Sequence, residues 1–464
     1  MKTKGIVIAG TNSGSGKTTI TMGIMAALQR KGKKIAPFKI GPDFIDPGHH
    51  ERITKSPSRN LDGWMLSKPY NLNCFINADK DADFAIVEGV MGLYDGYDGT
   101  TEAGSTAQMS KWLGIPVVLI VNARSMARSV AAIVQGFENF DPEVTFAGVI
   151  FNNLGSQRHF DYLKEAVDQA IKMPVLGGIP RNNELSIPER HLGLVTRDDY
   201  SLSNKTIDLL ADMIETHVDL NALIYNLKEI KINHTTMPKP AENNHVRIAV
   251  ARDNAFCFYY PDNFDWLAHF GAELVFFSPI SDKQLPDNIG GIYFGGGYPE
   301  LFAKELSQNH HLLLDIKEKS NANMPIYGEC GGFMYLCQTL QPHEDNKPYT
   351  MTGCFPFNTC MSKKLNALGY REINLIQDAV IGKKGMTLRG HEFHYSSVDT
   401  PVSENVCTHY QVTGRKNMAA YGDGFQIRNT LGSYIHLHFG SLPEAAQIFV
   451  NNCHNYMRSL DATQ

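Results

Sequence analysis

The chain has 464 residues, of which 43% are hydrophobic and 20% are charged, and its net charge is −5. This length predicts roughly two to four domains, and the composition is typical of a globular protein. The weakly negative charge gives no reason to expect a nucleic-acid or membrane partner, and apolar runs such as 115–121 are too short to cross a bilayer. The eight cysteines show no paired spacing, which predicts reduced thiols and a cytoplasmic location.

Strands and helices are expected to alternate through the first half of the chain. Residues 5–10 are predicted to form a buried strand, followed by a glycine-rich loop and a helix over 18–31. Further strands are expected at 84–87, 117–121 and 148–151, with helices at 125–137 and 159–171. This alternation predicts an α/β fold in which a parallel sheet is covered on both faces.

A second α/β domain is expected after a linker that is rich in proline, asparagine and lysine. Strands are predicted at 246–251, 274–277, 291–294 and 325–327, and the composition of 350–440 favours an antiparallel lobe. The expected boundaries are an N-terminal domain over 1–228, the linker over 229–244, a C-terminal domain over 245–446 and a helical tail over 447–464.

The loop after the first strand has the character of a phosphate-binding loop. Its sequence is GTNSGSGKTT over 10–19, one residue longer than the strict motif, with Thr11 where that motif has glycine. Glycines let backbone N–H groups turn toward a phosphate at the helix N-terminus, Lys17 reaches terminal phosphates, and the Thr18 hydroxyl binds Mg²⁺. The residues predicted to bind a nucleotide are Thr11, Asn12, Gly14, Ser15, Gly16, Lys17, Thr18 and Thr19. The alternative is a glycine-rich turn with an incidental lysine.

Several carboxylates are candidates for Mg²⁺ or for substrate. Glu88 follows the strand at 84–87, at the edge of a parallel sheet where ligands bind. Asp43 and Asp46 lie in KIGPDFIDPGHH over 39–50, whose two prolines predict a non-helical path. Thr18, Asp46 and Glu88 are the predicted ligands of Mg²⁺, which prefers oxygen. The alternative for Asp43, Asp46 and Asp95 is the capping of turns.

Cys330 lies in Gly328-Glu329-Cys330-Gly331-Gly332, which has the form of a nucleophile elbow. Small neighbours permit the sharp turn that exposes the thiol, and nearby backbone N–H groups hold an oxyanion. We expect Gly331 and the glycines Gly296 and Gly297 to supply those donors. The alternative is a buried structural cysteine.

A reactive thiol needs a base, and histidine is the usual one. His436 and His438 lie in SYIHLHF over 433–439, where alternation in a strand would place both on one face. His391 and His394 form a second cluster in RGHEFHY over 389–395. No third ligand accompanies either pair in the sequence, so we do not expect a metal centre there.

Together these motifs resemble the cobyrinate a,c-diamide synthase family of tetrapyrrole biosynthesis, close to the Ni-sirohydrochlorin a,c-diamide synthases. The resemblance covers nearly the whole chain and includes GTNSGSGKTT (10–19), FKIGPDFIDPGHH (38–50), VEGVMGLYDG (87–96), FGGGYPE (294–300), YGECGGFMYL (327–336), RGHEFHYS (389–396) and SYIHLHFG (433–440). It implies an N-terminal P-loop, ATP-binding amidoligase domain similar to dethiobiotin synthetase. It also implies a C-terminal class I glutamine amidotransferase domain of the triad type.

The resemblance also implies roles for individual residues. Cys330 matches the nucleophile and His436 the histidine that activates it. Simpler class I amidotransferases have a glutamate two residues after that histidine, where this chain has His438, so the third triad member stays open. Residues near the activated carboxylate are implied to be Asp43, Phe44, Ile45 and Asp95. Candidates for contacts to an anionic macrocycle are Arg190, Arg389, His391 and His394.

The implied activity is a carbon–nitrogen ligase reaction that uses ATP, Mg²⁺ and glutamine. It amidates the a and c carboxylates of a tetrapyrrole through acyl phosphates, with ammonia from glutamine hydrolysis. The substrates would be glutamine and an anionic tetrapyrrole, and a homodimer is compatible with the sequence. The alternatives are a Ni-sirohydrochlorin a,c-diamide synthase of coenzyme F430 biosynthesis, a CTP synthase, and a P-loop ATPase switch with a degenerate amidotransferase domain.

Overall fold

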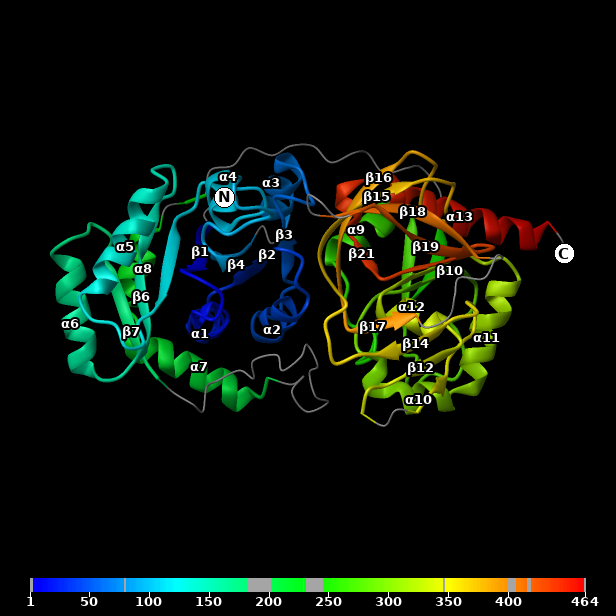
Figure 1. The fold of residues 1–464 in the computed structure, drawn as a ribbon, viewed down its shortest axis with the longest axis horizontal. Coiled ribbons are helices and arrows are strands. Elements are labelled where there is room, and N and C mark those ends of the chain that lie inside the picture. Colours follow the sequence, from blue (N-terminus) through cyan, green and yellow to red (C-terminus); the bar gives the residue numbers. More distant parts are fainter. Residues whose placement is uncertain are drawn as a thin grey trace. The chain divides into compact units, whose positions relative to one another are not determined.

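The computed structural model describes residues 3–78, 81–181, 202–227, 229–230, 245–344, 347–398, 406–414 and 419–462. The described residues divide into two compact units, the first containing residues up to 230 and the second those from 245 onward. Figure 1 shows that each unit combines a sheet with helices. No helix in these ranges is long and apolar enough to span a bilayer.

The first unit is built on a seven-stranded parallel sheet with the order β3-β2-β4-β1-β5-β6-β7. The strands are β1 (Lys4–Gly10), β2 (Ile35–Ile40), β3 (Arg59–Leu61), β4 (Phe84–Gly92), β5 (Val117–Asn122), β6 (Phe146–Leu154) and β7 (Val175–Pro180). The strands predicted from the apolar runs are therefore confirmed, each within a few residues.

Helices cover both faces of this sheet, as the alternation predicted. They are α1 (Lys17–Arg30), α2 (Ile45–Thr54), α3 (Lys68–Asn77), α4 (Thr106–Leu113), α5 (Ser129–Phe140), α6 (Gln157–Asp168), α7 (Asn204–His217) and α8 (Leu220–Asn226). Val7 and Ala9 of β1 pack in one core with the apolar side chains of α3 to α6. Ile6 and Ile8 pack in the opposite core with α1, α7 and α8. Successive strand residues thus point to opposite faces, and both faces are buried.

The prediction of a non-helical path through Asp43 and Asp46 is wrong for the second of these residues. Asp46 lies in the first turn of α2, and Pro47 follows it. Proline is tolerated there because the first N–H groups of a helix have no intrahelical partner. The Asp43 carboxylate, just before the helix, accepts the N–H groups of Ile45 at 3.3 Å and Asp46 at 3.2 Å.

The second unit is built on a ten-stranded mixed sheet with the order β21-β16-β15-β18-β19-β20-β11-β10-β8-β9. Pairings from β9 to β20 are parallel, whereas those from β20 to β21 are antiparallel, which confirms the predicted antiparallel lobe. The strands are β8 (Val246–Ala251), β9 (Ala272–Phe277), β10 (Ile289–Phe294), β11 (Ile326–Glu329), β15 (Ala367–Leu375), β16 (Thr387–His394), β18 (Cys407–Thr413), β19 (Tyr421–Ile427), β20 (Thr430–Ser433) and β21 (Ile435–Leu437).

A smaller sheet and several helices complete this unit. The sheet pairs β13 (Tyr349–Thr350), β12 (Thr339–Gln341), β14 (Asn358–Met361) and β17 (Ser396–Val398). The helices are α9 (Pro261–His269), η1 (Pro299–Phe302), α10 (Ala303–Gln308), α11 (His310–Asn321), α12 (Gly331–Leu336), η2 (Phe439–Ser441) and α13 (Glu444–Asp461).

Most of the segment expected as a helical tail lies in α13, which begins at Glu444 and packs against β8, β10 and α9. A Cβ atom on Gly291 of β10 would lie 2.3 Å from the Cys453 Sγ, so the absence of a side chain there lets this helix approach the sheet. The helix therefore belongs to the core of the second unit.

Candidate active sites

The phosphate-type loop joins β1 to α1. Five of the eight residues predicted to bind a nucleotide lie in the loop, and Lys17, Thr18 and Thr19 lie in the first turn of α1. Gly14 has φ 77° and Gly16 has φ 98°, a left-handed conformation that favours glycine. A Cβ atom on Gly10 would lie 2.1 Å from the Ser15 Oγ, so the loop curls tightly over the end of its own strand. This conformation directs the start of α1 toward the space that a phosphate would occupy.

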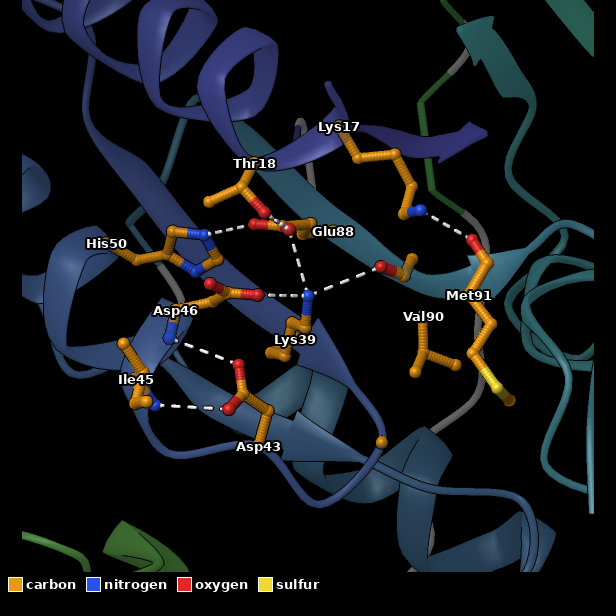
Figure 2. A network of polar contacts seen from close by, with 12 residues as sticks. Lys17, Thr18, Lys39, Asp43, Ile45, Asp46, His50, Glu88, Val90 and Met91 are labelled. Carbon is orange, nitrogen blue, oxygen red and sulfur yellow. Dashed lines mark hydrogen bonds and ion pairs between the residues drawn. The ribbon is translucent and has the colours of Figure 1, made fainter. Parts of the chain in front are cut away.

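Lys17 is buried against its own loop. Its Nζ donates to the carbonyl oxygen of Met91, as Figure 2 shows. It also donates to the carbonyl oxygen of Asn12 at 3.2 Å. Burial and the nearby Lys39 ammonium lower the pKa of Lys17 to about 8, against the pull of neighbouring carboxylates. An arriving anion would raise that pKa again, because a negative charge favours the ammonium.

Glu88 lies in the middle of β4, because the strand continues to Gly92 and does not end at residue 87 as predicted, and it is the centre of a buried polar network. Its carboxylate accepts hydrogen bonds from the Thr18 hydroxyl at 2.6 Å, the Lys39 Nζ at 2.9 Å and the His50 Nε2 at 2.7 Å (Figure 2). Burial by itself raises the pKa of Glu88, but Lys39 and His50 outweigh it, and the net shift is downward. The group is therefore a carboxylate at neutral pH.

Lys39 supplies the positive charge between the two predicted metal-binding carboxylates. Its Nζ lies 2.5 Å from the Asp46 Oδ2 as well as 2.9 Å from the Glu88 Oε1. Burial lowers the pKa of Lys39, but Asp46 and Glu88 more than compensate, so its pKa is raised overall. The structure thus brings together Thr18, Asp46 and Glu88, as predicted, around an ammonium that was not predicted.

Lys39 and His50 were both missed by the interpretation of the sequence. The signal for Lys39 is a lysine inside the otherwise apolar strand β2, since a lysine is almost never fully buried unless it is paired. The signal for His50 is its spacing of four residues from Asp46 in α2, which places both on one helix face. The His50 Nδ1 lies 3.0 Å from the Ser58 Oγ, so both ring nitrogens have a partner.

Asp43, Phe44, Ile45 and Asp95 lie near this network, at the start of α2 and after β4. Asp43 to Asp46 are half-buried, which leaves part of each accessible to a ligand. The Asp95 Oδ2 accepts the Gly92 N–H at 2.8 Å, and Asp43 caps α2. Both aspartates therefore make the turn contacts of the simpler alternative.

The oxygen donors of this network fit Mg²⁺. Within the described ranges no three His, Cys, Asp or Glu side chains converge into a metal cage. Mg²⁺ seldom uses such a cage; it binds one or two carboxylates together with water and substrate phosphates. Glu88, Asp46 and the Thr18 hydroxyl beside the phosphate-type loop are such a donor set.

In the second unit, Cys330 occupies the sharp turn between β11 and α12. Its φ is 49° and its ψ is −105°, an unusual conformation for a residue with a side chain. Its N–H donates to the Ser433 carbonyl at 2.8 Å, which ties the turn to the neighbouring strand β20. Cys330 as a residue is only 7% exposed, so the turn does not expose the thiol to solvent as the motif predicted. Its sulfur lies 4.0 Å from the Phe393 carbonyl of β16. The backbone therefore has the form that the elbow motif predicted.

The predicted oxyanion donors differ in their availability. A Cβ atom on Gly331 would lie 3.1 Å from the Gly297 amide nitrogen, so these two glycines adjoin each other beside Cys330. The Gly296 N–H instead donates to the Phe258 carbonyl at 3.2 Å. For Gly297 and Gly331 the role of oxyanion donor stays a prediction, whereas the contact to Phe258 argues against Gly296.

The two C-terminal histidines do not share a strand face, contrary to the prediction. β21 ends at Leu437, and His438 caps the 3₁₀ helix that follows, where its Nδ1 accepts the Gly440 N–H at 3.0 Å. His436 interacts with Cys330 and lies 3.7 Å, Nδ1 to Oε2, from Glu329. Burial lowers the pKa of His436, but Cys330 and Glu329 outweigh burial and raise it to about 9.

The predicted macrocycle ligands in β16 have protein partners. Arg389 pairs with Glu372 at 2.9 Å on the surface, and the His394 Nε2 lies 2.8 Å from the Glu392 Oε1. The His394 ring also stacks on Tyr434, with 3.9 Å between ring centroids. His391 lies directly across from His436 in the sheet.

Arg190, the fourth predicted macrocycle ligand, lies outside the described residues.

Comparison with known proteins agrees with this pairing of sites. Residues 6–195 match the CobQ/CobB/MinD/ParA nucleotide binding domain, and residues 247–443 match the CobB/CobQ-like glutamine amidotransferase domain. The chain is thus an α/β protein in which a nucleotide-binding domain precedes a glutamine amidotransferase domain.

Full-length relatives narrow the class. Cobyrinate a,c-diamide synthase of Dehalococcoides mccartyi is 44% identical over 96% of this chain and 97% of its own length. The synthases of Syntrophotalea carbinolica and Leptospira interrogans are 43% and 41% identical, each over 97% of this chain and 98% of their own length. The chain belongs to the cobyrinate a,c-diamide synthase family of glutamine-dependent amidating ligases.

Proposed function

We propose that this protein amidates the a and c carboxylates of cobyrinate, using ATP for activation and glutamine as the nitrogen source. The observation that carries the proposal is the presence in one chain of a phosphate-type loop beside a carboxylate network and of an elbow cysteine beside a buried histidine. Family membership over nearly the whole chain supports the choice of substrate.

In the first unit the proposed step is the activation of a carboxylate. A carboxylate oxygen attacks the γ-phosphorus of ATP, ADP leaves, and an acyl phosphate forms. The loop amides and Lys17 hold the phosphates, and the Lys39 ammonium offsets charge that develops during the transfer. Mg²⁺, held by Thr18, Asp46 and Glu88, would supply Lewis-acid neutralisation of the phosphates. Ammonia then displaces phosphate and leaves the amide.

In the second unit the proposed step is the release of ammonia from glutamine. The Cys330 sulfur attacks the carboxamide carbon, and the N–H groups of Gly297 and Gly331 face the developing oxyanion. His436 transfers the thiol proton to the departing nitrogen, which leaves as neutral ammonia. Water then cleaves the thioester to give glutamate and the free thiol.

Substitution of Cys330 by serine tests this division of labour. Cys330→Ser should abolish glutamine-dependent amidation and leave amidation with added ammonium chloride within about twofold of wild type, because only the first unit is then needed. Product formation is followed by mass spectrometry, which counts the amide groups on each macrocycle. Loss of both activities in a folded variant would refute the proposal.

The same assay separates the two macrocycles. Wild-type protein is supplied with ATP, Mg²⁺ and glutamine and with either cobyrinate or Ni-sirohydrochlorin. We expect two amides to be added to cobyrinate. Faster conversion of Ni-sirohydrochlorin would show instead that the protein is a Ni-sirohydrochlorin a,c-diamide synthase. Glutamine hydrolysis in the absence of any amidation would remove the ligase assignment.

A further inference from the structure

The glutamate that orients the catalytic histidine in simpler class I amidotransferases lies two residues after that histidine, and this chain has no glutamate there. Two residues after His436 the chain has His438, which cannot supply a carboxylate. The His438 Nδ1 already accepts the Gly440 N–H, and its ring lies against Tyr260 with 4.6 Å between centroids. A histidine that acts as a base needs an acceptor that fixes its ring and its tautomer. The acceptor for His436 must therefore come from elsewhere in the second unit.

Glu329, the residue directly before Cys330, is the carboxylate near the Nδ1 atom of His436. The Glu329 Oε2 is 3.7 Å from the His436 Nδ1, and both side chains are at most 3% exposed. This distance suits an ion pair and exceeds a direct hydrogen bond by about 0.5 Å. Catalytic contacts are often long before substrate binds and shorten in the reactive complex.

Three neutral donors hold the Glu329 carboxylate in place. The Oε1 accepts the Tyr327 hydroxyl at 2.6 Å and the Leu437 N–H at 3.1 Å, and the Oε2 accepts the Tyr293 hydroxyl at 3.2 Å. These donors come from β11, β21 and β10. Burial and the nearby Glu329 raise the pKa of both tyrosines well above the ordinary value, so both phenols stay protonated.

The bond to Leu437 ties the carboxylate to the residue that follows His436 in β21. The position of Glu329 and the position of the histidine are thus set by the same pair of strands. In the described part of the chain, His436 is the basic side chain that forms an ion pair with Glu329. A buried carboxylate is costly without a partner of opposite charge, and protonated His436 is that partner.

We propose that Glu329 is the positioning residue of this site, a carboxylate at the end of β11 that orients His436 toward Cys330 in the turn that follows. The inference rests on the proposed glutaminase role of Cys330 and His436. It fills the open place in the triad with a residue adjacent to the cysteine. The upward pKa shift of His436 agrees with it, because Cys330 and Glu329 together stabilise the protonated ring.

The test is Glu329→Gln in the full-length protein, assayed for glutaminase activity and for ammonia-dependent amidation. Glutamine is nearly isosteric and keeps the contacts to the tyrosines, but it has no charge to orient an imidazolium. We expect kcat for glutamine hydrolysis to fall about 100-fold with little change in KM, because the base is misoriented after substrate has bound. Ammonia-dependent amidation should stay within about twofold of wild type.

The pH profile separates positioning from a merely structural role. The titratable groups around His436 are Cys330 at the elbow, Glu329 in β11 and His391 in β16; Tyr293 and Tyr327 face the carboxylate. Removal of the Glu329 charge should lower the pKa of His436, so the limb of the kcat/KM profile that reports this histidine should move to lower pH. Asp423→Asn, which removes another buried carboxylate of this unit, is the matched control and should leave that limb in place.

Glu329→Asp keeps the negative charge but moves it away from His436 by the length of one methylene group. Its kcat should lie between those of Glu329→Gln and the wild-type protein. If Glu329→Gln retains wild-type kcat and an unshifted profile, the proposal is wrong. If Glu329→Gln fails to fold, as shown by a changed circular dichroism spectrum and loss of the wild-type unfolding transition, Glu329→Asp decides: unchanged kcat and an unshifted profile in that variant would overturn the proposal. Absence of glutaminase activity in the wild-type protein would instead reject the proposed function itself.

Discussion

The two units prepare for chemistry in different ways. The first unit contains a largely buried cluster of charged side chains. Lys39, Asp46 and Glu88 form ion pairs beside a loop whose glycines leave room for phosphate. The second unit depends on backbone conformation. One strained residue, Cys330, lies between a strand and a short helix, and the buried His436 interacts with it. The comparison teaches that a site for a highly charged ligand can be kept ready by internal ion pairs, whereas a site for a neutral amide depends on backbone geometry.

The comparison predicts that the two chemistries can be removed separately, and Lys17 gives the largest effect. Lys17→Met should reduce ATP-dependent amidation about 1000-fold, because a preorganised cation facing the phosphates is lost. Glutaminase activity in the same preparation should persist. Lys31→Met, an exposed lysine just after α1, is the matched control and should retain both activities. A parallel loss of glutaminase in Lys17→Met would show that the second unit depends on the first.

The ion pairs of the first unit predict an effect on stability. Lys39→Met should lower the free energy of unfolding of that unit by about 3 kcal/mol, because two buried carboxylates lose their cation. Chemical denaturation followed by fluorescence measures the change. The double substitution Lys39→Met with Glu88→Gln should recover part of it, since one of the uncompensated charges is then gone. If the single substitution leaves stability unchanged, the cluster is hydrated and the contrast between the units is weaker than described.

His50 predicts the smallest effect. His50→Asn removes a ring that holds one oxygen of Glu88, and it should raise the Mg²⁺ concentration needed for half-maximal ADP formation about tenfold. Direct titration of Mg²⁺ in the presence of a non-hydrolysable ATP analogue gives a second readout that is independent of turnover. Ser58→Ala, which removes only the bond to the far side of the ring, should cause a smaller shift. Equal Mg²⁺ dependence in all three proteins would exclude a positioning role for this histidine.

The sequence was sufficient for the strands and for the two motifs that lie on single turns. Apolar runs marked β1, β4, β5 and β8, and glycine spacing marked the phosphate-type loop and the Cys330 elbow. Such features depend on neighbours in the chain, so local patterns predict them. The path of α2 was mispredicted because a proline in the first turn of a helix was taken to exclude the helix.

The polar partners could not be predicted because they come from distant segments. Lys39 meets Glu88 across 49 residues, and the Leu437 N–H meets Glu329 across 108 residues. Nothing in the local pattern around Glu329 distinguishes it from any acidic residue beside a cysteine. Its significance follows from the contact between β21 and the end of β11, which are not paired in the sheet and meet only in the folded unit.

The left-handed backbone at position 330 has a consequence for how this centre evolves. A residue with a side chain in such a conformation costs on the order of 1–3 kcal/mol, a penalty that glycine would avoid. Glycine at this position would relieve the backbone strain, but it would also remove the sulfur and the packing of a buried side chain. The strained cysteine is therefore explained by the reactivity of its thiol and not by the stability of the turn.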